Sequence, residues 1–194
     1  MLDSDERLQI VAFSTNESRH TPNDIINIFL EQHSHSIIKK TSQTLAFSTV
    51  LSNSPESIKI MICSVLNLTK QYNGITEVNC YLLFIDLENE ESKYKIESII
   101  NYAKNFCDLN KKIFALGMIS GNNEEIKYIN KEQIINILKI AQTNYEYKEI
   151  NINKIKEVSN IIMEVLVYCS ENSIKDYTYQ NEKEGDKGNS CAIF

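Results

Sequence analysis

Residues 80–87, Cys-Tyr-Leu-Leu-Phe-Ile-Asp-Leu, decide the fold of this 194-residue chain. Asp86 is the only charged residue among them, so side chains on both alternating faces of an extended segment would be apolar. A strand of this kind is covered on both faces, as strands are in the middle of a parallel sheet. We therefore expect a central, buried strand here, with the other elements arranged around it.

On either side of this strand, the sequence alternates between strand-like and helix-like periodicity. Further strands are expected at residues 7–13, 44–51, 57–65, 112–117 and 145–150, with a turn at 53–55 making a hairpin of the second and third. Helices are expected from Thr21 and Pro22, as N-cap and first helical residue, and at residues 92–107, 131–143 and 154–170. Residues 33–43 are interpreted as a polar loop, and residues 67–73 are ambiguous, with a short helix as one interpretation.

This order predicts an α/β fold, a three-layer sandwich with a six-stranded, mostly parallel sheet and helices on both faces. Ligands of such sheets bind at the carboxyl ends of the strands. Chemistry is therefore expected in the loops after Phe13, Val65, Gly117 and Ile150. Residues 1–170 are expected to form one domain, and the polar, aperiodic residues 171–194 a flexible tail.

Composition excludes several classes of protein. Twenty Lys and Arg against 26 Asp and Glu give a net charge of -6, which argues against a general nucleic-acid binder. The polar N-terminus predicts no signal peptide, and the apolar runs are too short to span a bilayer. The five cysteines are scattered without a CxxC pair, which argues against a zinc site or a redox motif. Four of them are expected to lie reduced in a cytosolic core.

Residues 82–92, Leu-Leu-Phe-Ile-Asp-Leu-Glu-Asn-Glu-Glu-Ser, resemble the fourth strand and following loop of Ras-superfamily small GTPases. The resemblance is closest to the Rab branch, where the pattern is written LLVYDxTNEES. Residues 114–117 are similar to the strand before the guanine-reading loop, and residues 147–149 to the approach to the last helix. The resemblance covers roughly residues 7–170 and implies a small-GTPase-like fold of the P-loop NTPase type. The alternative is another α/β domain, of flavodoxin-like type.

The phosphate loop of this family, G-x-x-x-x-G-K-[ST], is degenerate after the first strand. Its glycines let backbone N–H groups wrap the phosphates, and its lysine reaches them. Here Ser14 and Arg19 replace the glycines, His20 replaces the lysine, and Glu17 adds a negative charge. Thr21 remains; it would bind magnesium only with a nucleotide, and its N-cap role already explains it. Arg19 and His20 could still offer positive charge to a phosphate at the helix N-terminus.

The other nucleotide motifs of the family are also lost. No D-x-x-G can be placed between residues 58 and 78, where Asp is absent and the only glycine is Gly74. The N-K-x-D position, which reads guanine, holds Met118, Ile119, Ser120 and Gly121. The S-A-K position holds Asn151, Ile152 and Asn153. The resemblance therefore implies a scaffold without ordinary guanine-nucleotide binding, with no catalytic residue, no metal and no cofactor expected, and with GTP hydrolysis disfavoured.

Two further features have an ordinary interpretation. His33 and His35 could be metal ligands, but with no clustered Cys or Asp nearby a solvated loop is the better interpretation. The acidic run at residues 88–91 is interpreted as a solvated loop that leads to Ser92 as a helix cap.

The chain ends in Cys191, Ala192, Ile193 and Phe194, the pattern read by prenyltransferases, and a terminal Phe favours a geranylgeranyl chain. The preceding tail is not polybasic and carries no second cysteine near Cys191. One lipid chain gives modest anchoring, so weak, exchangeable attachment or reinforcement by a protein partner is expected. The motif predicts a cytoplasmic protein, peripheral on the cytosolic face of a membrane, with a prenyltransferase and a prenyl-binding chaperone as partners.

Three functional hypotheses follow. The leading one is a Rab-like pseudo-GTPase, a prenylated module that binds trafficking or scaffold proteins in vesicle trafficking or signalling. The second is a divergent GTPase that binds GTP or GDP with magnesium, with Thr21 on the metal, and acts as a trafficking switch. The third is a constitutive structural subunit of a multiprotein complex, to which the lipid is incidental.

Overall fold

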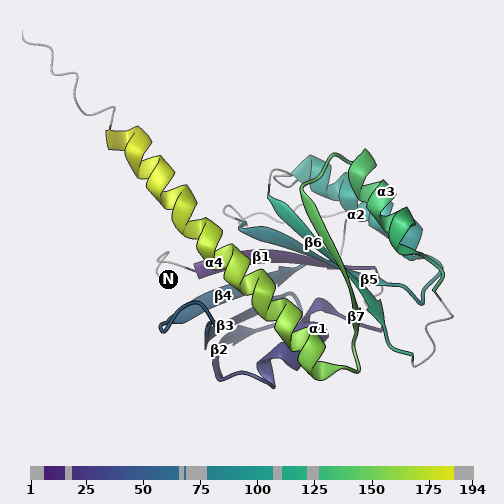
Figure 1. Cartoon of the computed structure of the whole chain (residues 1–194), viewed down its shortest axis with the longest axis horizontal. Helices are drawn as coiled ribbons and strands as arrows, with labels where there is room; N and C mark the ends of the chain where they lie inside the picture. The colour runs from purple at the N-terminus through teal and green to yellow at the C-terminus, as the bar shows by residue number, and fades with distance from the viewer. Residues whose placement is uncertain are drawn as a thin grey trace, which may run out of the picture.

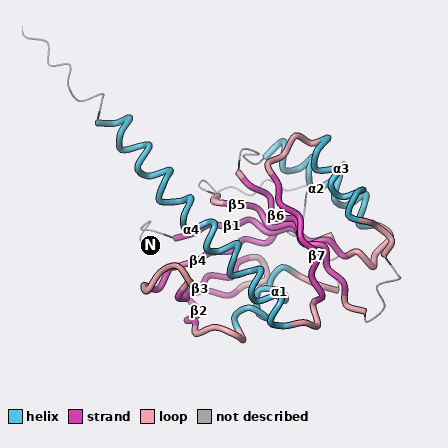
Figure 2. The backbone as a smooth tube through the Cα atoms, viewed as in Figure 1, coloured by secondary structure: helices cyan, strands magenta, loops and turns pink. Residues whose placement is uncertain are grey.

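The computed structural model describes residues 7–15, 19–65, 68, 78–106, 111–121 and 127–185. These residues form an α/β fold in which one sheet lies between two pairs of helices (Figures 1 and 2). The elements are β1 (Arg7–Ser14), α1 (Pro22–Leu30), β2 (His35–Lys40), β3 (Thr44–Val50), β4 (Ser57–Ser64), β5 (Cys80–Asp86), α2 (Ser92–Phe106), β6 (Lys112–Ile119), α3 (Lys131–Ile140), β7 (Tyr145–Asn151) and α4 (Ile155–Gly185). Helices α1 and α4 cover one face of the sheet, and α2 and α3 cover the other.

Within the described residues, the sheet has seven strands in the order β2-β3-β4-β1-β5-β6-β7, and it is mixed. Strands β4, β1, β5, β6 and β7 run parallel, whereas β3 is antiparallel to both of its neighbours. The prediction of a six-stranded, mostly parallel sheet is therefore wrong in the number of strands. Numbered along the chain, the five parallel strands have the order 2-1-3-4-5, as in doubly wound sheets whose ligands bind where the strand order reverses.

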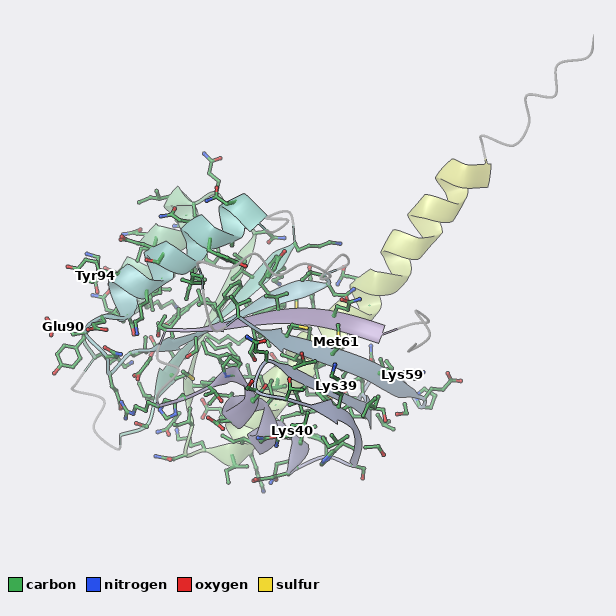
Figure 3. All side chains as sticks on the ribbon, turned by 180° about the vertical axis from the view of Figure 1, so that it is seen from behind. Lys39, Lys40, Lys59, Met61, Glu90 and Tyr94 are labelled. Carbon is green, nitrogen blue, oxygen red and sulfur yellow. The ribbon has the colours of Figure 1, made fainter. Side chains whose placement is uncertain are left out.

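The additional strand, β2, lies where residues 33–43 were expected to form a loop. All six of its residues are exposed, so it has no buried face, and its sequence therefore lacks the apolar alternation that marks a strand. Its pairing with β3 is interrupted by a bulge between Ile37 and Lys39. Lys39 and Lys40 are the last two residues of β2 (Figure 3). Lysines and bulges are common on edge strands because they discourage pairing with other chains.

The expected central strand is confirmed. All seven residues of β5 are buried, and β5 lies between β1 and β6. Its side chains alternate between two cores: Leu82 and Phe84 pack with α1 and α4, and Leu83 and Ile85 with α2 and α3. The hairpin of β3 and β4 is also confirmed.

Helix α1 begins as the sequence predicts. Thr21 is its N-cap, its hydroxyl accepts a hydrogen bond from the backbone N–H of Asp24, and Pro22 is the first helical residue. At the other end of the chain, α4 extends to Gly185, so the expected domain boundary at residue 170 falls inside a helix. Among the described helices, none has the length and apolar character needed to cross a bilayer.

Candidate functional site

The candidate site lies where the parallel strand order reverses, at the carboxyl ends of β1 and β5. The chain leaves β1 towards α1 on one face of the sheet and leaves β5 towards α2 on the other. In doubly wound sheets, this divergence of two neighbouring loops opens the crevice in which ligands bind. The loop after β6 and the turn after β7 end at the same edge.

The Glu88 carboxylate lies at the centre of this edge and accepts hydrogen bonds from three sides. The backbone N–H groups of Ser120 and Gly121 donate to Oε1 over 3.0 and 2.7 Å. The Ser120 hydroxyl and Arg19 Nη2 donate to Oε2, each over 2.6 Å. The side chain of Glu88 is only 13% exposed. Two backbone N–H groups and a guanidinium are what a site for an external anion would offer, and here they hold an internal one.

This environment keeps Glu88 ionised. Burial alone would raise the pKa of its carboxyl group, but the hydrogen bonds from Ser120, Gly121 and Arg19 outweigh that and lower the pKa to about 2. The neighbouring His20 responds in the opposite way: partial burial, and then the charge of Arg19, lower the pKa of its imidazole. This shift disfavours the charged form of His20, so its imidazole offers less positive charge to the site than an exposed histidine would.

Arg19 joins the loop after β1 to the loops after β5 and β6. Besides Glu88, it reaches Asp86 at 3.6 Å and the hydroxyl of Ser120. Asp86 is 1% exposed, so this pair is shielded from solvent on the carboxylate side. Arg19 therefore takes part in the site from the degenerate phosphate loop, and its cation is paired with carboxylates of the same chain.

Below this layer, buried hydroxyl groups fasten the ends of β1 and β5 together. The backbone N–H of Asp86 donates to Thr15 Oγ1 over 2.9 Å, and Thr15 Oγ1 lies 3.0 Å from Ser92 Oγ. Ser92 donates in turn to the carbonyl of Asp86 over 2.5 Å. Ser92 is the first residue of α2 and is fully buried, so its hydroxyl ties the helix to β5. Buried polar groups whose hydrogen bonds are made in this way form a rigid base for the site.

The remaining residues of the degenerate phosphate loop are occupied locally. The Ser14 hydroxyl donates to the carbonyl of His20 over 2.9 Å, which closes the loop on itself. The Thr21 hydroxyl donates to Asp24 over 2.7 Å and takes part in the capping box of α1. Residues 16–18, which include Glu17, lie outside the described residues.

The positions that correspond to the base-reading motifs are partly in the site. Asn153 Nδ2 donates to the carbonyl of Ser120 over 2.5 Å and so supports the N–H groups that hold Glu88. Asn151 Oδ1 accepts from the backbone N–H of Asn153 over 3.0 Å and shapes that turn. The remaining positions are Met118, Ile119 and Ile152: the Met118 carbonyl accepts from Leu87 N–H over 3.0 Å, and the Ile119 carbonyl accepts from Ile152 N–H over 2.9 Å. The Met118 side chain is buried in the core under α4.

Sequence reasoning missed Glu88. Residues 88–91 were interpreted as one solvated acidic loop, and Glu90 and Glu91 are indeed exposed. Glu88 differs because it follows the end of β5 by two residues, where the strand still directs the chain towards the neighbouring loops. The sequence signal for an inward-facing carboxylate was Glu88 shortly after the end of β5, together with Arg19 in the loop after β1, because both loops end at the same edge of the sheet.

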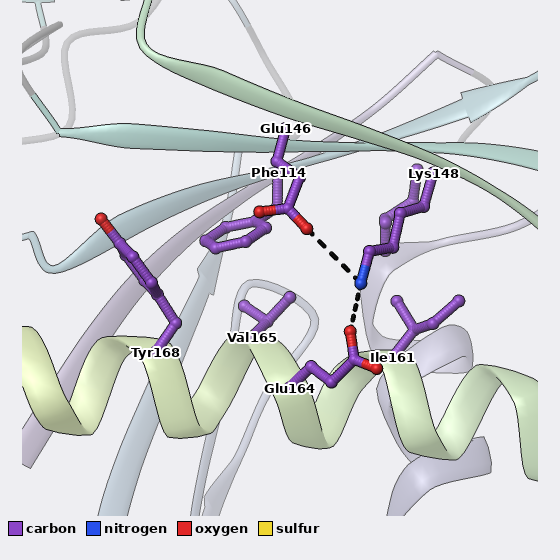
Figure 4. A pocket seen from close by; sticks show the side chains of 8 residues that line it. Phe114, Glu146, Lys148, Ile161, Glu164, Val165 and Tyr168 are labelled. Carbon is purple, nitrogen blue, oxygen red and sulfur yellow. Dashed lines mark hydrogen bonds and ion pairs between the residues drawn. The ribbon is translucent and has the colours of Figure 1, made fainter.

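A small cavity under α4 is a second feature of the described residues (Figure 4). It has a volume of about 70 Å³ and is lined by apolar side chains with Glu146, Lys148 and Glu164 at its mouth. Lys148 lies 3.4 Å from Glu146 and also pairs with Glu164. Pockets for small molecules usually measure about 300–1,000 Å³, so this cavity is too small for such a ligand, and its charges are already paired.

Within the described residues, no three His, Cys, Asp or Glu side chains gather in a way that could hold a metal ion. His33 and His35 do not face a common point: His33 Nε2 lies 2.8 Å from Ser159 Oγ, and His35 Nδ1 lies 3.0 Å from the carbonyl of His33. The sequence predictions for the D-x-x-G region around Gly74, for residues 67–73 apart from residue 68, and for lipidation at Cys191 fall on residues outside the description.

Comparison with known proteins assigns the chain to no family. No model of a known protein family matches it, and a search of curated proteins finds no match.

Proposed function

We propose that this protein is a Rab-like pseudo-GTPase, a protein-binding module that has a small-GTPase-like scaffold and does not use a bound nucleotide as a switch. The observation that carries the proposal is the position of Glu88. Its carboxylate is held by the N–H groups of Ser120 and Gly121 and by Arg19, at the edge of the sheet where a ligand would bind. The order of the elements, which differs from the expected one by the added β2, supports the proposed scaffold.

A phosphate would have to compete with this internal carboxylate for the same donors. Displacing Glu88 would leave Asp86 and Glu88 as two negative charges beside the incoming anion, with Arg19 as the cation shared among all three. Like charges in a partly buried site repel strongly. The site is therefore better suited to holding the loops after β1, β5 and β6 in one arrangement than to exchanging a nucleotide.

A scaffold that is fixed in this way would act through its surface and its location. Prenylation at Cys191 would attach it weakly to the cytosolic face of a membrane, where it would bind trafficking or scaffold proteins continuously. Such a module differs from a timed switch because its loops need no γ-phosphate to order them.

The first test is nucleotide content. The full chain is purified in magnesium without added nucleotide, denatured, and its supernatant analysed by ion-exchange chromatography. We expect no released nucleotide and no thermal shift with millimolar GTP or GDP. Near-stoichiometric GDP or GTP would refute the proposal and favour a divergent, nucleotide-binding switch.

A matched pair of variants tests the role of Glu88 in the same assay. Glu88→Gln removes the buried charge, and Glu91→Gln removes an exposed charge from the same loop. If Glu88 keeps the site closed, a thermal shift with inorganic phosphate or GDP should appear in Glu88→Gln and not in Glu91→Gln. Binding of equal strength by wild type and both variants would show that Glu88 does not close the site.

The membrane part of the proposal has a separate test. Wild type and Cys191→Ser are expressed in a eukaryotic cell and separated into membrane and soluble fractions. We expect the wild type to be partly in the membrane fraction and Cys191→Ser to be soluble. Equal pelleting of the two proteins would exclude a lipid on Cys191 as the cause of membrane attachment.

A further inference from the structure

Two buried thiols face each other on the side of the sheet covered by α4. Cys80 is the first residue of β5, and Cys169 lies on α4, 89 positions later in the chain. Their sulfur atoms are 2.8 Å apart, and the residues are 0% and 1% exposed. A disulfide has a sulfur–sulfur distance of about 2.05 Å, so an approach of roughly 0.8 Å would bring the pair to bonding distance.

We propose that Cys80 and Cys169 are a redox-active pair that forms an intramolecular disulfide, which locks α4 onto the central strand. The two sulfur atoms lie at hydrogen-bonding distance in this structure, and no disulfide joins them. The proposal goes beyond the proposed function, because the pair lies at the amino end of β5, whereas Asp86 and the candidate site lie at its carboxyl end.

The position of Cys169 determines how an oxidant would reach the pair. Cys169 is the last buried apolar position of α4 among the described side chains, and Glu171 shortly after it is exposed. Opening of this end of α4 breaks fewer buried contacts than release of the whole helix, and local openings of this kind occur in native proteins. Cys169 is therefore the thiol that solvent reaches first.

The reaction balances with glutathione disulfide as the oxidant. The thiolate of Cys169 attacks one sulfur of glutathione disulfide, forming a mixed disulfide and releasing one glutathione. The Cys80 thiolate then attacks the Cys169 sulfur and releases the second glutathione. The protein loses two electrons and two protons, and the oxidant gains both.

The surroundings of Cys80 set the rate of the second step. Burial, and then the neighbouring Cys169, raise the pKa of the Cys80 thiol, while the cation of Lys112 opposes that effect. Lys112 is the partner of Cys80 in the pairing of β5 with β6. A raised pKa makes attack slow in the closed protein, so the bond is expected to form during opening or folding. Once formed, it is shielded from reductants by the same burial.

Thiol counting tests the proposal on the full chain, which has five cysteines. The native protein, and protein refolded from denaturant, are incubated with glutathione disulfide, then denatured and alkylated. Intact mass should show three alkylated cysteines, and peptide mapping should recover a peptide that joins Cys80 to Cys169. Alkylation of all five cysteines after both treatments, or a disulfide that joins other cysteines, would overturn the proposal.

Variants separate the pair from the other thiols. The oxidised wild type should melt about 10 °C above the reduced protein, because the bond closes a loop of about 90 residues. Cys169→Ser should lose this shift, while Cys63→Ser, which removes a thiol that is not in the pair, should keep it. An equal shift in Cys169→Ser and wild type would show that the stabilisation comes from elsewhere.

Discussion

Replacing Glu88 by glutamine should destabilise the protein more than its position in a surface loop suggests. The carboxyl pKa falls from 4.5 to about 2, and at about 1.4 kcal/mol per pKa unit this corresponds to about 3 kcal/mol of preferential stabilisation of the charged form. The carboxamide can still accept one hydrogen bond. Its NH2 group, however, would face Arg19 or a backbone N–H, and two donors repel. We expect a loss of about 2–3 kcal/mol in the free energy of unfolding.

The assay is urea denaturation of wild type, Glu88→Gln and the control Glu91→Gln at pH 7. Glu91 is exposed and pairs with Lys95 at 3.8 Å, so its substitution should change stability by less than about 0.5 kcal/mol. Because the folded-state pKa of Glu88 is lowered, its contribution is complete above the unfolded value of 4.5 and is lost as the pH falls towards about 2. The gap between wild type and Glu88→Gln should therefore shrink between pH 5 and pH 3. A gap that matches the control at pH 7, or one that ignores pH, would refute this reasoning.

Three other predictions concern stability, measured by thermal or urea unfolding. Gly117→Ala should cost about 1–3 kcal/mol because the new Cβ would lie 2.5 Å from Tyr147 Oη, and adding Tyr147→Phe should recover part of the loss; a full cost in the double variant would contradict this. Thr21→Ala should cost about 1 kcal/mol and Thr21→Ser much less, since the serine hydroxyl can still cap α1; equal losses would exclude the cap as the cause. Burial lowers the pKa of His33, so the imidazole stabilises the fold when neutral, and stability should fall as the pH drops below 6.5. In His33→Asn this part of the pH dependence should be absent, and an unchanged profile would assign it to other groups.

The sequence identified the elements whose local pattern of apolar and capping residues is distinctive. The run at residues 80–87 predicted a strand buried on both faces, and Thr21 before Pro22 predicted where α1 begins, because each signal is local. Strand β2 could not be found in this way. Its six residues are all exposed, and its existence depends on backbone pairing with β3, which leaves no trace in side-chain polarity.

The sequence predicted where the loops of the candidate site lie, but it did not predict the hydrogen bonds between them. The loops after parallel strands meet at one edge of the sheet, so the arrival of Arg19 and Ser120 at that edge follows from topology. Glu88 turns inwards, whereas Glu90 and Glu91 face solvent. This difference depends on which backbone N–H groups the loop after β6 directs towards Glu88. The position of Glu88 two residues after β5 is a signal in the sequence, but the N–H groups that meet its carboxylate belong to a loop more than thirty residues further along the chain.

The length of α4 determines how the segment after residue 170 leaves the domain. From residue 170 to Gly185 it adds 15 residues of helix, about 22 Å at 1.5 Å per residue. A flexible chain of equal length would have a root-mean-square extension of about 21 Å, so the two connections reach equally far. They differ in direction, because a flexible chain leaves the domain free to tumble, whereas a helix continuous with the packed part of α4 points one way. The helix ends six positions before Cys191, so its direction sets from which side of the sheet a chain that carries a lipid on Cys191 would leave the domain.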